Sequence, residues 1–354
     1  MIHLKIFIGK RDGEKSCSNP KHDGDERGGR IRFPVADEAG RNPSTGACCI
    51  IQPMNSPAPL DFLGIGAPRA GTTWLWTVLR QHPQIWMPPR KELHYFDRNE
   101  KYPSASHLQH ERPPARMFGL DRSSQKWRRV FGTDVYYLLT GKNKAAEIPW
   151  LARYHFGRVN DAWYLSLFEN RPSRVRGEIT PAYCMLDMED VQRVHALLPE
   201  VKILYTLRDP VERSWSQIRF GMGRRGLAIN EQAMPEIQRR ANSLSQQLTG
   251  DYVGTLKKWR AVYPAERMFI LFQDQIEREP EQLTHSLYRF LGVDESFQLP
   301  AGILRRKVNA SAESEMPSAV RRLLVESHYP QVVELNKMIG GYTNQWLDSY
   351  RAAM

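Results

Sequence analysis

The sequence predicts one α/β domain, a three-layer fold in which a central parallel sheet is flanked by helices. Three observations predict this fold class. An apolar run at residues 62–65 leads through a glycine-rich turn into a segment with apolar side chains at helical spacing. Apolar runs at residues 202–207 and 268–272 are each followed by a further helix-like segment. Alternating strands and helices favour parallel strands, which need crossover connections.

The N-terminal part of the chain differs in composition from the rest. Residues 11–58 are rich in Gly, Pro, Ser, Asp and Arg and show no sustained periodicity. This predicts a disordered or low-complexity extension over residues 1–58 and a folded domain over residues 59–354. Translation that begins at Met54 is an open alternative. No apolar run approaches 18 residues, so we expect neither export nor a membrane anchor.

Composition and charge limit the class of partner. The 354 residues are 41% hydrophobic and 25% charged, and the formal net charge of +11 favours an anionic ligand or an acidic polymer. Neither zinc-finger spacing nor an RNA-recognition signature is present, so we expect no nucleic-acid partner. The cysteines have no metal-ligand or disulfide spacing, which favours a reducing cytoplasm; they are Cys17, Cys48, Cys49 and Cys184.

The turn at residues 66–73 predicts an anion site. Its glycine spacing matches the nucleotide triphosphatase loop, G-x-x-x-x-G-K-[ST], but Thr72 stands where that loop has lysine. In a strand–turn–helix unit the backbone N–H groups and the helix N-terminus point at one spot. With Arg69 as its only cation, the loop is expected to hold a shorter phosphate group than the triphosphate of ATP.

A second anion site is expected after the strand at residues 202–207. Asp209 as N-cap, Pro210 at the first helical position and Glu212 two residues later predict that a helix begins at once. Arg208 therefore lies at the carboxyl end of the strand, where ligands of open α/β sheets gather. Ser216 lies two turns into the helix.

These segments resemble a known family. Residues 68–74 (PRAGTTW) are similar to the 5′-phosphosulfate loop of sulfotransferases that use 3′-phosphoadenosine 5′-phosphosulfate (PAPS). Residues 208–216 (RDPVERSWS) resemble the segment of those enzymes that binds the 3′-phosphate, and residues 91–97 (KELHYFD) resemble a segment of the heparan sulfate and bacterial carbohydrate sulfotransferases. Residues 176–183 resemble their G-E-x-[ST]-P-x-Y segment. The alternative interpretation of these residues is a short strand that ends at a proline, with Tyr183 packed as a core aromatic. Residues 305–311 resemble their late basic loop, in which Lys307 is our choice.

The resemblance implies a P-loop-like fold and an in-line transfer of a sulfuryl group from PAPS to a hydroxyl or amine, on a saccharide acceptor. It implies that Glu92 is the base, with a pKa raised toward working pH, that His94 orients the acceptor or shares this role, and that Arg69 neutralises the leaving oxygen. No metal is expected. The residues implied to bind the cofactor are Arg69, Ala70, Gly71, Thr72, Thr73, Trp74, Arg208, Ser216 and Lys307.

Two other functions stay open at this point. One is a nucleotide kinase of related fold, and the other is a noncatalytic module that binds acidic polymers through its positive charge. The choice between O- and N-sulfation, the identity of the acceptor and the oligomeric state do not follow from these residues.

Overall fold

A computed structural model describes residues 60–103, 106–142, 144–169, 173–300, 302–304 and 315–352. All of them lie in the compact unit Asn55–Met354. The predicted extension over residues 1–58 lies outside the described residues and stays a prediction.

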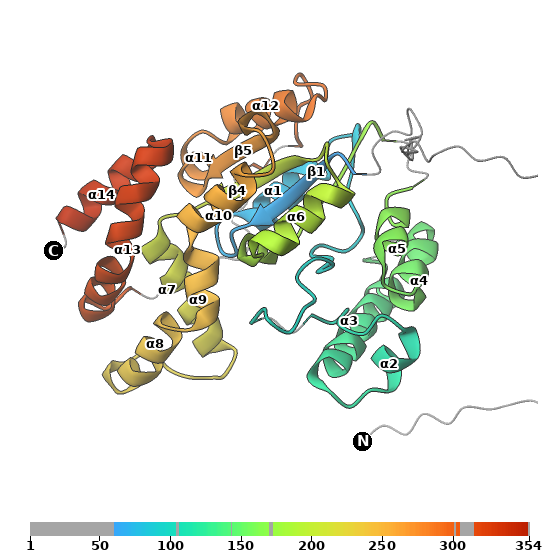
Figure 1. The fold of residues 1–354 in the computed structure, drawn as a ribbon, viewed down its shortest axis with the longest axis horizontal. Helices are drawn as coiled ribbons and strands as arrows, with labels where there is room; N and C mark the ends of the chain where they lie inside the picture. The colour runs from blue at the N-terminus through green and yellow to red at the C-terminus, as the bar shows by residue number, and fades with distance from the viewer. Residues whose placement is uncertain are drawn as a thin grey trace, which may run out of the picture. The chain divides into compact units, whose positions relative to one another are not determined.

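The centre of this unit is a five-stranded sheet in which every pair of neighbouring strands is parallel (Figure 1). The strand order is β2-β3-β1-β4-β5, so β1 is central. The strands are β1 (Phe62–Gly66), β2 (Ile85–Trp86), β3 (Val175–Ile179), β4 (Lys202–Leu207) and β5 (Met268–Phe272).

Helices connect and cover these strands. The first half of the chain contains α1 (Thr72–Leu79), α2 (Pro113–Phe118), α3 (Arg122–Leu139), α4 (Ile148–Phe156), α5 (Asp161–Ser166) and α6 (Met188–Leu197). The second half contains α7 (Pro210–Gly223), α8 (Met234–Ala241), α9 (Leu244–Gly250), α10 (Tyr252–Arg260), α11 (Gln273–Arg278), α12 (Pro280–Leu291), α13 (Ser318–Ile339) and α14 (Tyr342–Arg351). Short 3-10 helices are η1 (Ala145–Glu147), η2 (Pro181–Met185), η3 (Glu231–Ala233) and η4 (Ala265–Arg267).

The sheet separates two hydrophobic cores, because successive side chains of a strand point to opposite faces. Phe62 and Leu204 pack with α1 and α12 on one face. Leu63, Ile203 and Tyr205 pack with α6, α10 and α13 on the other. In Figure 1, α6 and α10 lie in front of the sheet and α1 lies behind it. The three-layer α/β fold predicted from the sequence is confirmed.

Several elements differ from the prediction. A proline within a helical segment favours a break, but α13 continues through Pro330. Its buried side chains on both sides of the proline, Val325 and Val332, offset the lost backbone hydrogen bond. Strand β2 and helix α14 were not predicted.

Among the described cysteines, Cys184 is a buried free thiol. No helix of the described residues is long and apolar enough to cross a bilayer.

Candidate active site

The candidate site lies at the carboxyl ends of β1 and β4, where the topology reverses. The chain passes from β3 on one side of β1 to β4 on the other, and open α/β sheets bind ligands at such a point. The backbone N–H of Ala67 donates to the carbonyl of Thr206 at 2.7 Å, and the Thr206 hydroxyl donates to the Gly66 carbonyl at 2.5 Å. These bonds fasten the loop after β1 to the end of β4.

The loop after β1 has the tight turn that the sequence predicts. Gly71, with φ of 93°, is the N-cap of α1, and Arg69 has φ of 68°, so both residues adopt left-handed conformations. A Cβ atom on Gly71 would lie 2.6 Å from the Cδ1 atom of Ile276. Backbone conformation and space therefore both require glycine at this position.

The two predicted anion sites are in direct contact. The Arg69 side chain donates from Nε to the Ser216 hydroxyl at 3.1 Å. The Arg208 guanidinium donates to the backbone carbonyl of Arg69 at 3.3 Å. Burial lowers the pKa of Arg69, and the nearby charges of Arg208 and Arg219 lower it further. This concentration of positive charge is suited to a ligand with more than one anionic group.

A lysine that sequence reasoning missed also reaches the loop. This residue is Lys91. Its Nζ donates to the hydroxyls of Thr72 and Thr73, both at 3.3 Å, and to Glu92 Oε1 at 3.2 Å. Although Thr72 replaces the lysine of triphosphatase loops in sequence, Lys91 places an ammonium group beside the same turn.

Glu92, His94 and Asp97 form a chain of charged groups next to Lys91. Nδ1 of His94 lies 2.7 Å from Asp97 Oδ2, and Nε2 lies 3.6 Å from Glu92 Oε2. The Asp97 side chain is fully buried, that of His94 is 13% exposed, and that of Glu92 is 41% exposed. Glu92 is thus the member of the chain that an acceptor can reach.

Neighbouring charges decide the protonation of this chain. Burial would raise the pKa of Glu92, but the hydrogen bond from His94 and the charge of Lys91 outweigh it and lower the pKa to about 2. Burial would lower the pKa of His94, but Asp97 and Glu92 raise it to about 9. The expectation that the pKa of Glu92 is raised toward working pH is therefore wrong, because an imidazolium and an ammonium group flank the carboxylate.

The backbone around these residues is unusual. Glu92 and His94 have φ of 65° and 56°, and together with Arg69 they are the non-glycine residues with positive φ in the described part of the chain. Such conformations cost energy in ordinary residues and concentrate at functional sites. In an extended strand, residues two apart such as Glu92 and His94 would face the same side. They do meet, but through two left-handed turns.

A buried carboxylate holds this strained segment in place. Glu178 of β3 accepts hydrogen bonds from Thr180 at 2.7 Å and from Tyr183 at 3.0 Å, and burial raises its pKa. Thr180 then accepts from the N–H of Leu93 at 2.9 Å, and Tyr183 accepts from the N–H of Tyr95 at 3.0 Å. The segment at residues 176–183 therefore positions the residues around Glu92, and Tyr183 is the core aromatic of the alternative interpretation.

The remaining residues predicted to bind the cofactor lie in different parts of the structure. Ala70 and Trp74 are buried, and the Trp74 indole N–H donates to the Leu304 carbonyl at 3.0 Å. Trp74 thus packs beneath the loop and ties it to the segment that leads toward the late basic stretch. Lys307 lies outside the described residues.

Helix α3 adds a cation near the candidate base. Burial lowers the pKa of Lys126, while the carboxylates of Asp97 and Glu92 act in the opposite direction, and the guanidinium groups of Arg224 and Arg90 lower it further. Lys126 of α3 thus lies close enough to Asp97 and Glu92 for their charges to interact. Among the described residues, no cluster of His, Cys, Asp or Glu side chains could hold a metal ion.

The fold and site together define a class of protein. A parallel sheet with a glycine-rich loop and several cations at its carboxyl edge, next to an ionised glutamate, is typical of P-loop-like group-transfer enzymes that act on anionic donors. The family model described as "Sulfotransferase family" matches residues 61–297, well over half of the chain. The chain belongs to the sulfotransferase family.

Individual relatives agree with this assignment. The chain is 26% identical to a bifunctional heparan sulfate N-deacetylase/N-sulfotransferase of Drosophila melanogaster over 66% of this chain and 19% of that protein. It is 25% identical to human carbohydrate sulfotransferase 15 over 66% of this chain and 43% of that protein. The chain thus spans less than half of the length of these relatives.

The crystal structure of a sulfotransferase from Alicyclobacillus acidocaldarius has the same fold. Its TM-score is 0.55 at 22% identity, over 81% of this chain and 98% of that one.

Proposed function

We propose that the protein transfers the sulfuryl group of PAPS to a hydroxyl or amine of a saccharide. PAPS is the general donor of the family, and the names of two relatives, heparan sulfate N-sulfotransferase and carbohydrate sulfotransferase, support a saccharide acceptor. The observation that carries the proposal is the contact between the two anion sites, where Arg69 meets both Ser216 and Arg208. Family membership favours this function over a nucleotide kinase or a noncatalytic basic module.

The proposed division of labour assigns the two ends of the donor to the two sites. Arg208 and Ser216 would hold the 3′-phosphate, which distinguishes PAPS from ADP-like nucleotides. The loop amides, Arg69 and the hydroxyls of Thr72 and Thr73 would hold the 5′-phosphosulfate. Lys307, outside the described residues, stays a candidate for the 3′-phosphate.

Arg69 and Lys91 would stabilise the charge that develops during transfer. The acceptor oxygen or nitrogen forms a bond to sulfur while the bond from sulfur to the bridging phosphate oxygen breaks, and its electron pair leaves with adenosine 3′,5′-bisphosphate. Sulfuryl transfer resembles phosphoryl transfer in its loose transition state, so positioning and charge stabilisation dominate. Two fixed cations beside the bridging oxygen supply that stabilisation.

Glu92 would accept the proton of the attacking group. Its carboxylate is ionised at neutral pH, partly exposed and 3.6 Å from the His94 ring. The neighbouring imidazolium keeps the carboxylate in place, and Asp97 fixes the ring. The pKa of about 2 makes Glu92 a weak base in the free protein. Because the proton leaves late in a loose transition state, a weak base in the right place is sufficient.

Two measurements test the proposal. Adenosine 3′,5′-bisphosphate is expected to raise the melting temperature in the absence of magnesium, whereas ATP with magnesium is expected to leave it nearly unchanged. Radiolabelled PAPS offered with a panel of saccharides is expected to give a labelled product. A shift with ATP but none with the bisphosphate would contradict the proposed donor, and transfer to non-saccharide acceptors alone would contradict the proposed acceptor.

A further inference from the structure

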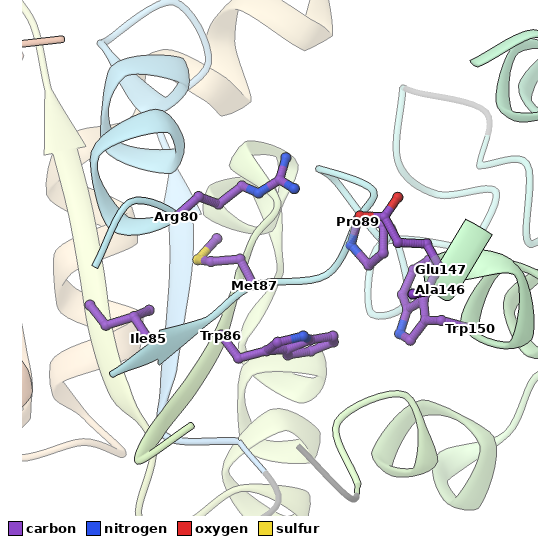
Figure 2. Close-up of a pocket in the computed structure, with 8 residues that line it drawn as sticks. All are labelled: Arg80, Ile85, Trp86, Met87, Pro89, Ala146, Glu147 and Trp150. Atoms are coloured by element: carbon purple, nitrogen blue, oxygen red, sulfur yellow. The ribbon is translucent and has the colours of Figure 1, made fainter. Parts of the chain in front are cut away.

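A cavity of about 190 Å³ lies at the edge of the sheet, apart from the phosphate loop (Figure 2). The edge strand β2 and the residues after it form one wall, the end of α1 contributes a second, and η1 with α4 forms a third. Among the residues that line it are Arg80, Trp86, Met87, Pro89, Glu147 and Trp150.

The aromatic part of the cavity is rigid. Trp150 is buried, its indole N–H donates to the Leu167 carbonyl at 2.9 Å, and its ring stacks on Tyr154 with centroids 5.2 Å apart. Trp86 packs edge to face against Phe168, with centroids 6.0 Å apart, and remains partly exposed. In Figure 2 its indole points into the space between β2 and α4. Such a fixed ring offers a flat apolar surface at little cost in entropy.

Opposite charges flank this surface. Arg80 is exposed, and its guanidinium carbon lies 4.3 Å from the centre of the Trp76 ring. Glu147 is half-buried, and one of its oxygens accepts from the N–H of Lys144 at 3.2 Å. Burial lowers the pKa of Arg80, whereas the charge of Glu147 raises it. Figure 2 places them on facing sides of the cavity.

This arrangement selects the chemistry of the ligand. A lone anion would be attracted by Arg80 and repelled by Glu147. A lone cation would be repelled by Arg80 and attracted by Glu147. A neutral ring with several hydroxyl groups can accept from the guanidinium and donate to the carboxylate at once, while its C–H face covers the indole. A pyranose has these properties.

The cavity is connected to the candidate active site by a short stretch of chain. Pro89 lines the cavity, and two residues later Lys91 donates to the phosphate loop. Glu92 follows Trp86 by six residues, which span at most about 20 Å when fully extended. An oligosaccharide that presents one unit to Glu92 is therefore long enough to place another unit here.

We propose that this cavity is an accessory subsite for a neutral, hydroxyl-rich sugar ring of the acceptor, distinct from the unit that is sulfated. The proposal rests on the proposed saccharide acceptor. The subsite selects oligosaccharides over single sugars, because a second ring bound nearby adds to the affinity of the first.

Binding is tested directly, without turnover. Chitotetraose, cellotetraose and mannotetraose are titrated into the full chain saturated with adenosine 3′,5′-bisphosphate, and binding is followed by saturation-transfer NMR and calorimetry. At least one neutral tetrasaccharide is expected to bind. Arg80→Gln and Glu147→Gln are each expected to weaken that binding by about five-fold or more, the effect of losing one hydrogen bond of about 1 kcal/mol.

Matched controls are Arg260→Gln and Glu266→Gln, which remove the same charges from exposed positions on α10 and η4. They are expected to bind as the wild type does. The proposal is overturned if no neutral tetrasaccharide binds, if both cavity variants bind like the controls, or if only a heparan sulfate tetrasaccharide binds.

Turnover measured in parallel separates this proposal from the proposed function. If a neutral tetrasaccharide binds through Arg80 and Glu147 but no saccharide is sulfated, the cavity is a sugar-binding site but the proposed function fails. If saccharides are sulfated but neither cavity variant changes binding, the proposed function holds and the subsite fails.

Discussion

At the scale of single residues, the chemistry depends on which groups are charged. Glu92 lies beside the protonated His94 and Lys91, and these neighbours keep it ionised. The hydrogen bond from His94 and the charge of Lys91 lower the pKa of Glu92, and Glu92 in turn helps to raise the pKa of His94. Replacing Glu92 is therefore expected to lower the pKa of His94.

Glu92→Gln is expected to lower kcat by about 10²- to 10⁴-fold, because the amide cannot accept a proton from the acceptor. The Kd of adenosine 3′,5′-bisphosphate should change less than about two-fold by calorimetry, since Glu92 lies outside the loop. Glu100→Gln, an exposed carboxylate of the next turn, is the control. A near-native rate for the Glu92→Gln variant would contradict the proposed role of Glu92 as the base.

The pH profile distinguishes the roles of Glu92 and His94. With pKa values of about 2 and about 9, the carboxylate is ionised and the imidazole is protonated between these limits. We expect kcat/KM to be flat from about pH 6 to 8 and to fall as the pH rises through 9, where the imidazolium loses its proton. If neutral His94 were the base, the rate would instead rise through pH 9.

Lys91→Met is expected to lower kcat by about 10²- to 10³-fold, the usual effect of removing one group that stabilises transition-state charge. Lys91→Arg should recover part of the rate because it restores the charge. Lys257→Met, at an exposed position of α10, serves as the control. A loss of bisphosphate affinity with an unchanged kcat would show that Lys91 only binds the donor.

At the scale of elements, the turn between β1 and α1 determines whether both phosphate groups can be held together. Its position follows from the glycine spacing, and its shape from the left-handed Gly71 and Arg69. A change in this turn therefore affects stability and affinity together.

Gly71→Ala is expected to lower the free energy of unfolding by about 1–3 kcal/mol, because alanine is strained at φ of 93° and its Cβ would meet Ile276. Bisphosphate affinity should fall as well. Adding Ile276→Ala restores space but not the backbone conformation, so it should recover only part of both losses.

Gly132→Ala is the matched control, since a Cβ at that position in α3 has no atom within 4 Å. It should stabilise the helix by up to about 1 kcal/mol. Thermal and chemical unfolding measure both changes. Equal effects of the two substitutions would contradict the role given to Gly71.

Local sequence signals account for these elements to different degrees. The strand at residues 202–207 and the start of α7 were predictable, because an apolar run and the Asp209 cap are local features. In the structure, the Asp209 side chain accepts hydrogen bonds from the N–H groups of Val211 and Glu212. The two-residue strand β2 is too short for a periodic signal. Proline is locally a helix breaker, so the continuity of α13 depends on tertiary packing.

The site residues show the same limit. Motifs single out Arg69, Glu92 and Arg208 as candidates. The contact of Lys91 with the loop instead depends on turns at Glu92 and His94 that distant residues of β3 and η2 impose. The low pKa of Glu92 could not be predicted, because it depends on the orientation of its neighbours.

At the scale of the whole molecule, the described residues form two cores on either face of one sheet, within Asn55–Met354. The N-terminal extension predicted from composition is expected to contribute to neither core.

The cytoplasmic location is a separate proposal, which is based on the spacing of the cysteines and can be tested by cell fractionation.

A chain that begins at Met54 is therefore expected to keep the melting temperature within about 2 °C and the bisphosphate Kd within about two-fold. The physical reason is that residues 11–58 are too polar to bury much apolar surface. Differential scanning calorimetry and titration calorimetry on both chains measure the two quantities. A large loss of stability would show that the extension is part of the fold.

The buried Glu178 connects the sheet and a covering helix to the segment around the candidate base. Through Thr180 and Tyr183 it anchors the backbone on both sides of His94 to β3, and it also accepts a hydrogen bond from Tyr164 of α5 at 2.8 Å. A substitution on α5 can therefore shift the geometry around Glu92 from a distance, without any contact to the bound ligands.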